Sequence, residues 1–125
     1  MSRDRGFSSS VTGSASESSV VEDLTPPGRP VTVDVAGQGR IRLTISRDAV
    51  LGRSKDADVC VERDAEASSR HAALYFQGAV LMLRDLGSSN GTFLNGTRVR
   101  QPERVDDGDV VLVGRTEVRV YMGRI

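Results

Sequence analysis

The chain has 125 residues, of which 38% are hydrophobic, 27% charged and 4% aromatic, and its 17 basic and 17 acidic side chains give a formal net charge of zero. This length suits one compact domain with a short tail, and it leaves no room for a multidomain enzyme. A zero net charge argues against a protein that coats nucleic acid or an anionic membrane, because both tasks need a broad field of positive charge.

The first 29 residues differ in composition from the rest of the chain. Residues 1–20 contain eight serines, and an acidic and then proline-rich stretch follows them. Such a segment cannot bury enough apolar surface to offset the entropy of ordering it. The composition therefore predicts a disordered serine-rich tail over residues 1–29 and a folded domain over residues 30–125.

From residue 30 onward, short apolar or alternating runs are separated by turn signals, which is the pattern of β-strands. The predicted strands lie at 31–35, 41–45, 49–51, 58–61, 71–76, 80–83, 110–113 and 117–121. The turn signals are Gln77-Gly78, Asn90-Gly91, Asn95-Gly96 and Asp107-Gly108. No segment has a helical period over ten or more residues, so we expect an all-β sandwich or barrel.

The single cysteine, Cys60, excludes an intramolecular disulfide and a metal site of paired cysteines. It lies in an apolar run and is predicted to be a small buried hydrophobe. No apolar run approaches the ~18 residues of a membrane helix, and the first residues lack the apolar region of a secretory signal. We therefore expect a cytoplasmic protein without a membrane partner, a metal or a cofactor.

The informative residues lie in the loops between the predicted strands. In chain order they form four blocks: Leu51-Gly52-Arg53-Ser54, Ser68-Ser69-Arg70-His71-Ala72, the segment from Asp85 to Gly96, and Asp107-Gly108-Asp109 before a valine-rich strand. Loops of this kind offer hydroxyl, amide and guanidinium donors without bulk. That inventory suits an oxyanion with several acceptor oxygens, such as a phosphate.

These four blocks, in this order and spacing, resemble the forkhead-associated (FHA) domains, which bind phosphothreonine peptides. The resemblance covers residues 31–123. This segment is similar to small bacterial FHA proteins and to FHA modules at the N-terminus of longer proteins. It implies a β-sandwich of two antiparallel sheets with about 10 or 11 short strands and with ligand-binding loops at one end.

The resemblance also implies a role for individual residues. Arg53 matches the arginine that binds the phosphate, and Ser68 matches the serine whose hydroxyl and backbone amide hold a phosphate oxygen. Ser69 is the alternative to Ser68 if the register shifts by one. Ser89 occupies the position of a hydroxyl residue that completes the phosphate site, and Asn90 matches the asparagine that binds the peptide backbone.

Four further residues are expected to support the site. His71 matches a structural histidine that orients the loops carrying Ser68 and Asn90. Gly52 and Gly91 are expected at tight backbone positions, and Asn95 is expected to hold loops together. A hydrolase is excluded because His71 is the single histidine and no serine has a nucleophile-elbow pattern around it.

Other motifs point to no chemistry of their own. The glycine-rich segment around Gly87 lacks the Lys-Ser/Thr of a nucleotide-binding loop and has no predicted helix after it. The aspartates Asp106, Asp107 and Asp109 lack the spacing and the terminal glutamate of a calcium loop. We therefore expect turns at both places.

The expected function is a non-enzymatic, phosphothreonine-dependent interaction module in Ser/Thr kinase signalling. Its partner would be a phosphorylated kinase or a kinase substrate, the domain would act as a monomer, and nucleic acid is not expected to bind. Glu66 is hypothesised to disfavour an acidic residue three positions after the phosphothreonine. The alternative function is a phosphate-independent assembly domain of a signalling or secretion complex.

The tail offers a second partner. Thr25 and Thr12 are expected phosphorylation sites, and a phosphorylated tail could occupy the FHA site of its own chain. A tethered ligand reaches an effective concentration of about a millimolar, which would fill a micromolar site. Only a few residues separate Thr25 from the first predicted strand, so Thr12 would reach the site more easily.

Overall fold

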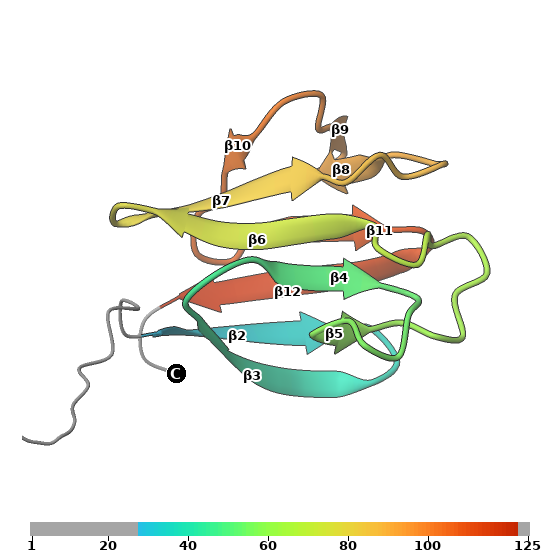
Figure 1. Cartoon of the computed structure of the whole chain (residues 1–125), viewed down its shortest axis with the longest axis horizontal. Coiled ribbons are helices and arrows are strands. Elements are labelled where there is room, and N and C mark those ends of the chain that lie inside the picture. Colours follow the sequence, from blue (N-terminus) through green and yellow to red (C-terminus); the bar gives the residue numbers. More distant parts are fainter. Residues whose placement is uncertain (1–27, 123–125) are drawn as a thin grey trace, which may run out of the picture.

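The computed structural model describes residues 28–122, so nearly all of the predicted tail, including both threonines, lies outside the described residues. Within them the chain forms eleven strands and no α-helix (Figure 1). The strands are β2 (Arg29–Val35), β3 (Gly39–Ile45), β4 (Ala49–Gly52), β5 (Val59–Cys60), β6 (Ala72–Gln77), β7 (Val80–Asp85), β8 (Thr92–Leu94), β9 (Thr97–Arg98), β10 (Glu103–Arg104), β11 (Val110–Val113) and β12 (Thr116–Met122).

The strands form two sheets that face each other in a sandwich. One sheet has the order β10-β7-β6-β4-β5, and the other has the order β3-β2-β12-β11-β8-β9. The predicted β-sandwich is therefore confirmed. One pairing differs from the expected antiparallel sheets, because β5 runs parallel to β4, with Leu51 opposite Val59. The connection between these two strands curls back on itself at the end of β4, which brings β5 alongside in the same direction.

Eight of the eleven strands coincide with the predicted runs. The three that the sequence pattern missed are β8, β9 and β10, which have three, two and two residues. An alternation of period two cannot be recognised over so few residues. Each of them is a strand because a neighbour pairs with it: Phe93 lies opposite Leu112, and Glu103 lies opposite Leu83.

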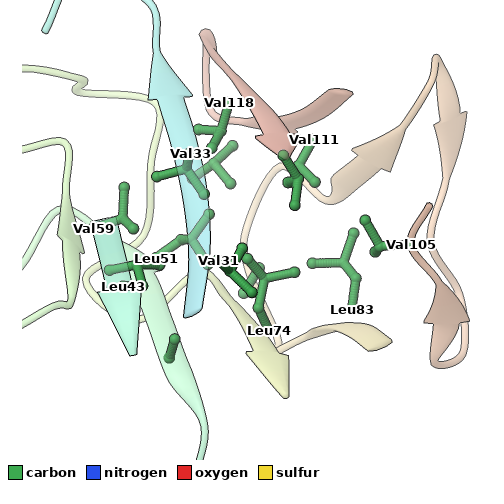
Figure 2. Close-up of a cluster of buried hydrophobic side chains, with 14 of the residues drawn as sticks. Val31, Val33, Leu43, Leu51, Val59, Leu74, Leu83, Val105, Val111 and Val118 are labelled. Carbon is green, nitrogen blue, oxygen red and sulfur yellow. The ribbon is translucent and has the colours of Figure 1, made fainter. Parts of the chain in front are cut away.

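The core lies between the sheets and consists almost wholly of aliphatic side chains. In β2, alternate residues Val31, Val33 and Val35 are buried, as expected for a strand with one face inward. Figure 2 shows Val31 and Val33 among side chains from the opposite sheet and from β11 and β12. Other fully buried members of this cluster are Leu51, Val59, Leu74, Leu81, Leu83, Val111, Val113, Val118 and Val120.

The longer connections gather at one end of the sandwich. In Figure 1, the arrows of β4, β7 and β11 point to the same side of the molecule, at the right of the view. The segments 53–58, 61–71 and 86–91 lie between strands at this side, and we call it the loop end. Across residues 28–122, no helix of the kind that could span a membrane is found.

Candidate functional site

Arg53 is held beside Ser68 and Ser69 by backbone hydrogen bonds. The amide of Arg53 donates to the carbonyl of Ser68 over 2.9 Å, and the amide of Ser54 donates to the carbonyl of Ser69 over 3.1 Å. This close approach requires Gly52, because a Cβ on that residue would lie 2.1 Å from the Ser69 carbonyl oxygen. The guanidinium of Arg53 is exposed and has no ion pair or hydrogen bond with other residues of the described range.

The buried side chain of His71 joins the Ser68 loop to the loop that carries Asn90. Its side chain is fully buried, its Nδ1 accepts a hydrogen bond of 3.0 Å from the amide of Ser68, and its Nε2 lies 2.8 Å from the carbonyl oxygen of Gly91. Because an amide can only donate, Nδ1 carries no hydrogen and Nε2 is the donor to Gly91. The neutral imidazole therefore fixes the Ser68 loop against the loop that carries Asn90.

The same two loops are also joined at the surface. The amide of Ser89 donates to Oγ of Ser68 over 3.1 Å. The side-chain amide of Asn90 donates to the carbonyl of Glu66 over 2.8 Å and lies 3.4 Å from its carboxylate oxygen Oε1. Sequence-predicted residues from three separate segments are thus brought to one place at the loop end.

One detail of the expected phosphate contact differs in the structure. The resemblance implies that Ser68 uses both its hydroxyl and its backbone amide, but that amide is already donated to His71. The hydroxyl is the donor that Ser68 has left. The amide of Ser69, by contrast, makes no hydrogen bond within residues 28–122, so its backbone donor is open while that of Ser68 is not.

Asp85 organises the Asn90 loop, although sequence reasoning gave it no role. Its carboxylate accepts hydrogen bonds from the amides of Gly87 and Ser88 over 2.9 and 3.0 Å, and from the hydroxyls of Ser88 and Thr92 over 2.5 and 2.6 Å. Partial burial by itself raises the pKa of Asp85, but the hydrogen bonds outweigh it and hold the pKa below its ordinary value. The loop is therefore folded around a carboxylate.

Asp64 has the equivalent role for the loop that leads to Ser68. It is 9% exposed and accepts hydrogen bonds from the amides of Glu66 and Arg115 over 3.0 and 2.7 Å and from the Thr116 hydroxyl over 2.6 Å. Burial raises its pKa, and the hydrogen bonds more than reverse that effect, so the pKa of Asp64 is lowered. Asp64 ties the Ser68 loop to the turn between β11 and β12.

The remaining predicted support residues lie slightly away from Arg53. Gly91 has a φ of +86°, and a Cβ there would lie 2.9 Å from Nε of Arg98. Asn95 also has a positive φ, of 50°, and both its amide and its side-chain oxygen Oδ1 are hydrogen-bonded to the backbone of Val110, over 2.8 and 3.0 Å. Asn95 thus fixes the turn between β8 and β9 onto β11.

Cys60 was predicted to be buried, and it is partly exposed. Because successive side chains of a strand point to opposite faces, the fully buried Val59 occupies the inward position of β5 and Cys60 faces outward. Within residues 28–122, no group of three or more His, Cys, Asp or Glu side chains is arranged to hold a metal ion.

The fold and the site define a β-sandwich whose ligand-binding chemistry resides in loops at one end. The family model of the FHA domain matches residues 49–114, and the chain belongs to this family. It is 38% identical over 79 residues to the FHA domain-containing protein FhaB of Mycobacterium tuberculosis, an alignment that covers 63% of this chain and 51% of FhaB. It is 35% identical over 96 residues to FhaA of the same species, covering 76% of this chain and 18% of FhaA. The chain thus spans about half of FhaB and under a fifth of FhaA.

Solved structures give the same family. A structure from work on phosphothreonine-dependent FHA domain interactions is 34% identical, has a TM-score of 0.68 and covers 77% of this chain and 99% of its own. The FhaA FHA domain, solved in complex with the intracellular domain of Rv3910, is 35% identical with a TM-score of 0.64, and the match covers 72% of this chain and 98% of that domain.

Proposed function

We propose that this domain binds phosphothreonine-containing segments of partner proteins at its loop end, as a non-enzymatic interaction module of Ser/Thr kinase signalling in the cytoplasm. The observation that carries the proposal is that Arg53, Ser68 and Asn90 lie on three loops that hydrogen bonds hold together. The Arg53 amide donates to the Ser68 carbonyl, and the Ser68 loop is joined to the Asn90 loop through His71 and the Ser89 amide. The solved relative from work on phosphothreonine-dependent interactions supports the same ligand chemistry.

The phosphate would be held by donors of three kinds. The exposed guanidinium of Arg53 offers a planar fork to two phosphate oxygens. The hydroxyl of Ser68 and the unused amide of Ser69 offer neutral donors beside it, and Ser89 adds a further exposed hydroxyl on the neighbouring loop. A dianion can thus be bound by a chain with no net charge, because the contacts are local.

Asn90 would hold the peptide backbone. The side-chain nitrogen donates to the Glu66 carbonyl over 2.8 Å and to the Glu66 carboxylate over 3.4 Å. These contacts fix the plane of the carboxamide and leave its oxygen to accept a hydrogen bond from a backbone amide of the peptide. The Glu66 carboxylate beside it supports the hypothesis that an acidic residue three positions after the phosphothreonine is disfavoured. A phosphopeptide array in which aspartate or glutamate at this position strengthens binding would contradict that hypothesis.

Catalysis by the single histidine has no support in this geometry. A general base needs a free nitrogen next to the group that it deprotonates. Both ring nitrogens of His71 are hydrogen-bonded to backbone groups, and its side chain is fully buried. These contacts support a structural role for His71 and binding without turnover.

The chain's own tail is a further proposed ligand, and the two threonines differ in reach. β2 begins with Arg29 at the end of the sandwich opposite to the loop end (Figure 1). Its seven residues span roughly 23 Å, whereas the four residues from Thr25 to Arg29 extend at most about 14 Å. Phosphorylated Thr12 would therefore reach the site of its own chain, and phosphorylated Thr25 would be offered only to a second molecule.

NMR spectra of the full chain test whether phosphorylated Thr12 and phosphorylated Thr25 differ in this way. After phosphorylation by a Ser/Thr kinase, the Thr25→Ala chain should show shifted signals for Ser68 and Asn90 at any protein concentration. The Thr12→Ala chain should show such shifts only as its concentration rises. Unchanged loop signals in both phosphorylated chains would exclude the tail as a ligand.

The decisive experiment for the proposed function is Arg53→Ala, measured by titration with phosphothreonine peptides derived from proteins captured by the wild-type domain. Loss of a charge-assisted phosphate contact should weaken binding by about 2 to 4 kcal/mol, or about 30-fold to 1,000-fold. Arg42→Ala, an exposed arginine of β3, is the matched control and should bind like the wild type.

Both variants should unfold at the wild-type temperature, because the exposed guanidinium of Arg53 has no ion pair or hydrogen bond within the described range that would be lost. Unphosphorylated peptides should not bind to any of the three proteins. If partner binding survives both Arg53→Ala and removal of the phosphate, the domain is a phosphate-independent assembly module and the proposed function is wrong.

A further inference from the structure

A second charged feature flanks the loop end. A hollow of about 470 Å³ lies between the end of β7 and the segment that follows β9, and its lining includes three arginines, Arg84, Arg98 and Arg100. The other lining residues are Asp85, Val99, Gln101 and Pro102. In Figure 1, this segment forms the arch from β9 to β10 at the top of the view, next to β7.

The lining of the hollow carries more positive charge than its one carboxylate neutralises. Arg98 and Arg100 are exposed, and neither has an ion pair or a side-chain hydrogen bond with any other residue of the range 28–122. Arg84 differs, because it is paired with Asp48 and lies 5.7 Å from the ring centre of Tyr75. Two of the three guanidinium groups are therefore open to an anion.

The one carboxylate in the lining is already occupied. Both oxygens of Asp85 accept hydrogen bonds, and the donors are Gly87, Ser88 and Thr92 in and beside the Asn90 loop. Those amide and hydroxyl dipoles stabilise its negative charge in place. Asp85 is thus committed to the loop and does not serve as the partner of Arg98 or Arg100.

The hollow adjoins the loop that carries Asn90. Arg98 packs against Gly91 so closely that a Cβ on Gly91 would lie 2.9 Å from its Nε atom. Gly91 directly follows Asn90, and its carbonyl is the group bound by His71. Because Arg98 lies against the residue next to Asn90, a peptide bound at Asn90 would have the hollow within a few residues of its contact.

We propose that the Arg98 and Arg100 hollow is an accessory anion-binding surface for acidic side chains that flank the phosphothreonine in the partner segment. This inference rests on the proposed function and extends it. Ion pairs at an exposed surface contribute little each, so the hollow would select among phosphorylated segments while Arg53 and its neighbours supply the main affinity.

The test uses three phosphothreonine peptides: one with neutral flanks, one with an acidic run before the phosphothreonine and one with the run after it. The runs are placed more than three residues away so that Glu66 is tested separately. One of the two acidic peptides should bind about threefold to tenfold more tightly than the neutral peptide at low salt. The gain should shrink as salt is added, because salt screens exposed charges.

Arginine variants test whether the hollow causes the tighter binding of the acidic peptide. Arg100→Gln should remove most of the gain and leave binding of the neutral peptide unchanged, and Arg98→Gln combined with it should remove the rest. Arg42→Gln, which deletes the same charge from β3, should keep the full gain. A lysine run in place of the acidic run should give none.

The outcomes separate the two proposals. If no phosphothreonine peptide binds the wild type, the proposed function fails and the accessory surface fails with it. If all three peptides bind equally, the proposed function stands and the accessory surface is wrong. If an acidic peptide gains affinity and Arg100→Gln together with Arg98→Gln keeps that gain, the acidic run acts elsewhere and the inference is again wrong.

Discussion

The two ends of the sandwich are built in different ways. All three polar or charged side chains that are buried within residues 28–122, Asp64, His71 and Thr92, lie at the loop end. At the opposite end, the chain turns in short connections that need no buried polar side chain. In the turn from Asp106 to Asp109, the Asp109 amide donates to the Asp106 carbonyl over 3.1 Å and the Asp106 amide donates to the Asp109 carboxylate over 2.8 Å, while Gly108 and Asp109 bond to the backbone of the adjacent strand β12.

The difference follows from loop length. A short turn satisfies its backbone groups within itself, whereas a long segment such as 61–71 leaves amides and carbonyls without a partner nearby. At the loop end, the buried side chains of His71 and Asp64 supply those partners, and each of them also contacts a segment distant in the sequence. Substitutions of these buried residues should therefore cost stability and binding together, while substitutions in the turns of the opposite end should cost little of either.

The largest effect is expected for His71→Ala. The change leaves a cavity and deprives the Ser68 amide and the Gly91 carbonyl of their partner, so the free energy of unfolding should fall by about 3 to 5 kcal/mol. Chemical denaturation measures this loss, and phosphopeptide titration should show weaker binding. Wild-type stability in the variant would mean that the loops do not depend on His71.

A smaller loss is expected for Gly52→Ala. Its Cβ would lie 2.1 Å from the Ser69 carbonyl oxygen, and separating the two segments should cost about 2 to 3 kcal/mol. Gly78→Ala is the matched control at the opposite end, where no atom lies within 4 Å of the new Cβ and only the positive φ of 64° opposes it. That strain should cost about 1 kcal/mol. Equal losses by denaturation would contradict the contrast between the ends.

Acid should weaken the loop end through Asp64 and Asp85. Both carboxyls have a lowered pKa in the folded state, so the stability that they contribute is complete above the unfolded-state pKa of about 3.9 and is lost as the pH falls through the lower folded values. Denaturation curves from neutral pH down to acid measure this loss. Asp85→Asn and Asp64→Asn should each be less stable at neutral pH and show a shallower loss in acid. A slope identical to that of the wild type would show that these carboxyls do not drive the acid response.

The smallest effect is expected for Arg104→Gln. Its ion pair with Asp106, with Nε 2.8 Å from the carboxylate, lies away from the loop end, and the two side chains are 71% and 61% exposed. An ion pair this open to water should contribute less than about 0.5 kcal/mol. A change in unfolding temperature larger than that of Gly78→Ala would mean that the opposite end depends on charge pairs after all.

Much of the fold could be predicted from the sequence. Longer strands such as β2 and β12 repeat an apolar residue at every second position, and that period is a local property. The two-residue strands β9 and β10 carry no such signal, and the parallel direction of β5 follows from how the chain curls after Gly52. Asp64 could not be recognised either, because its partners Arg115 and Thr116 are about fifty residues away.

The sequence by itself determined the class of the fold and the family, and it predicted the phosphate-site candidates, because strand periodicity and the spacing of the loop motifs are written in consecutive residues. The tertiary structure alone decided which polar groups are occupied within the fold and which remain open. The Ser68 amide is hydrogen-bonded to His71 and the Asp85 carboxylate to the Asn90 loop, whereas Arg98 and Arg100 are open beside that loop. The physical reason is that a polar group is occupied when a neighbour in space bonds to it, and that neighbour can be distant in the sequence. In a chain with a net charge of zero, these contacts determine where positive charge remains available for a phosphorylated partner.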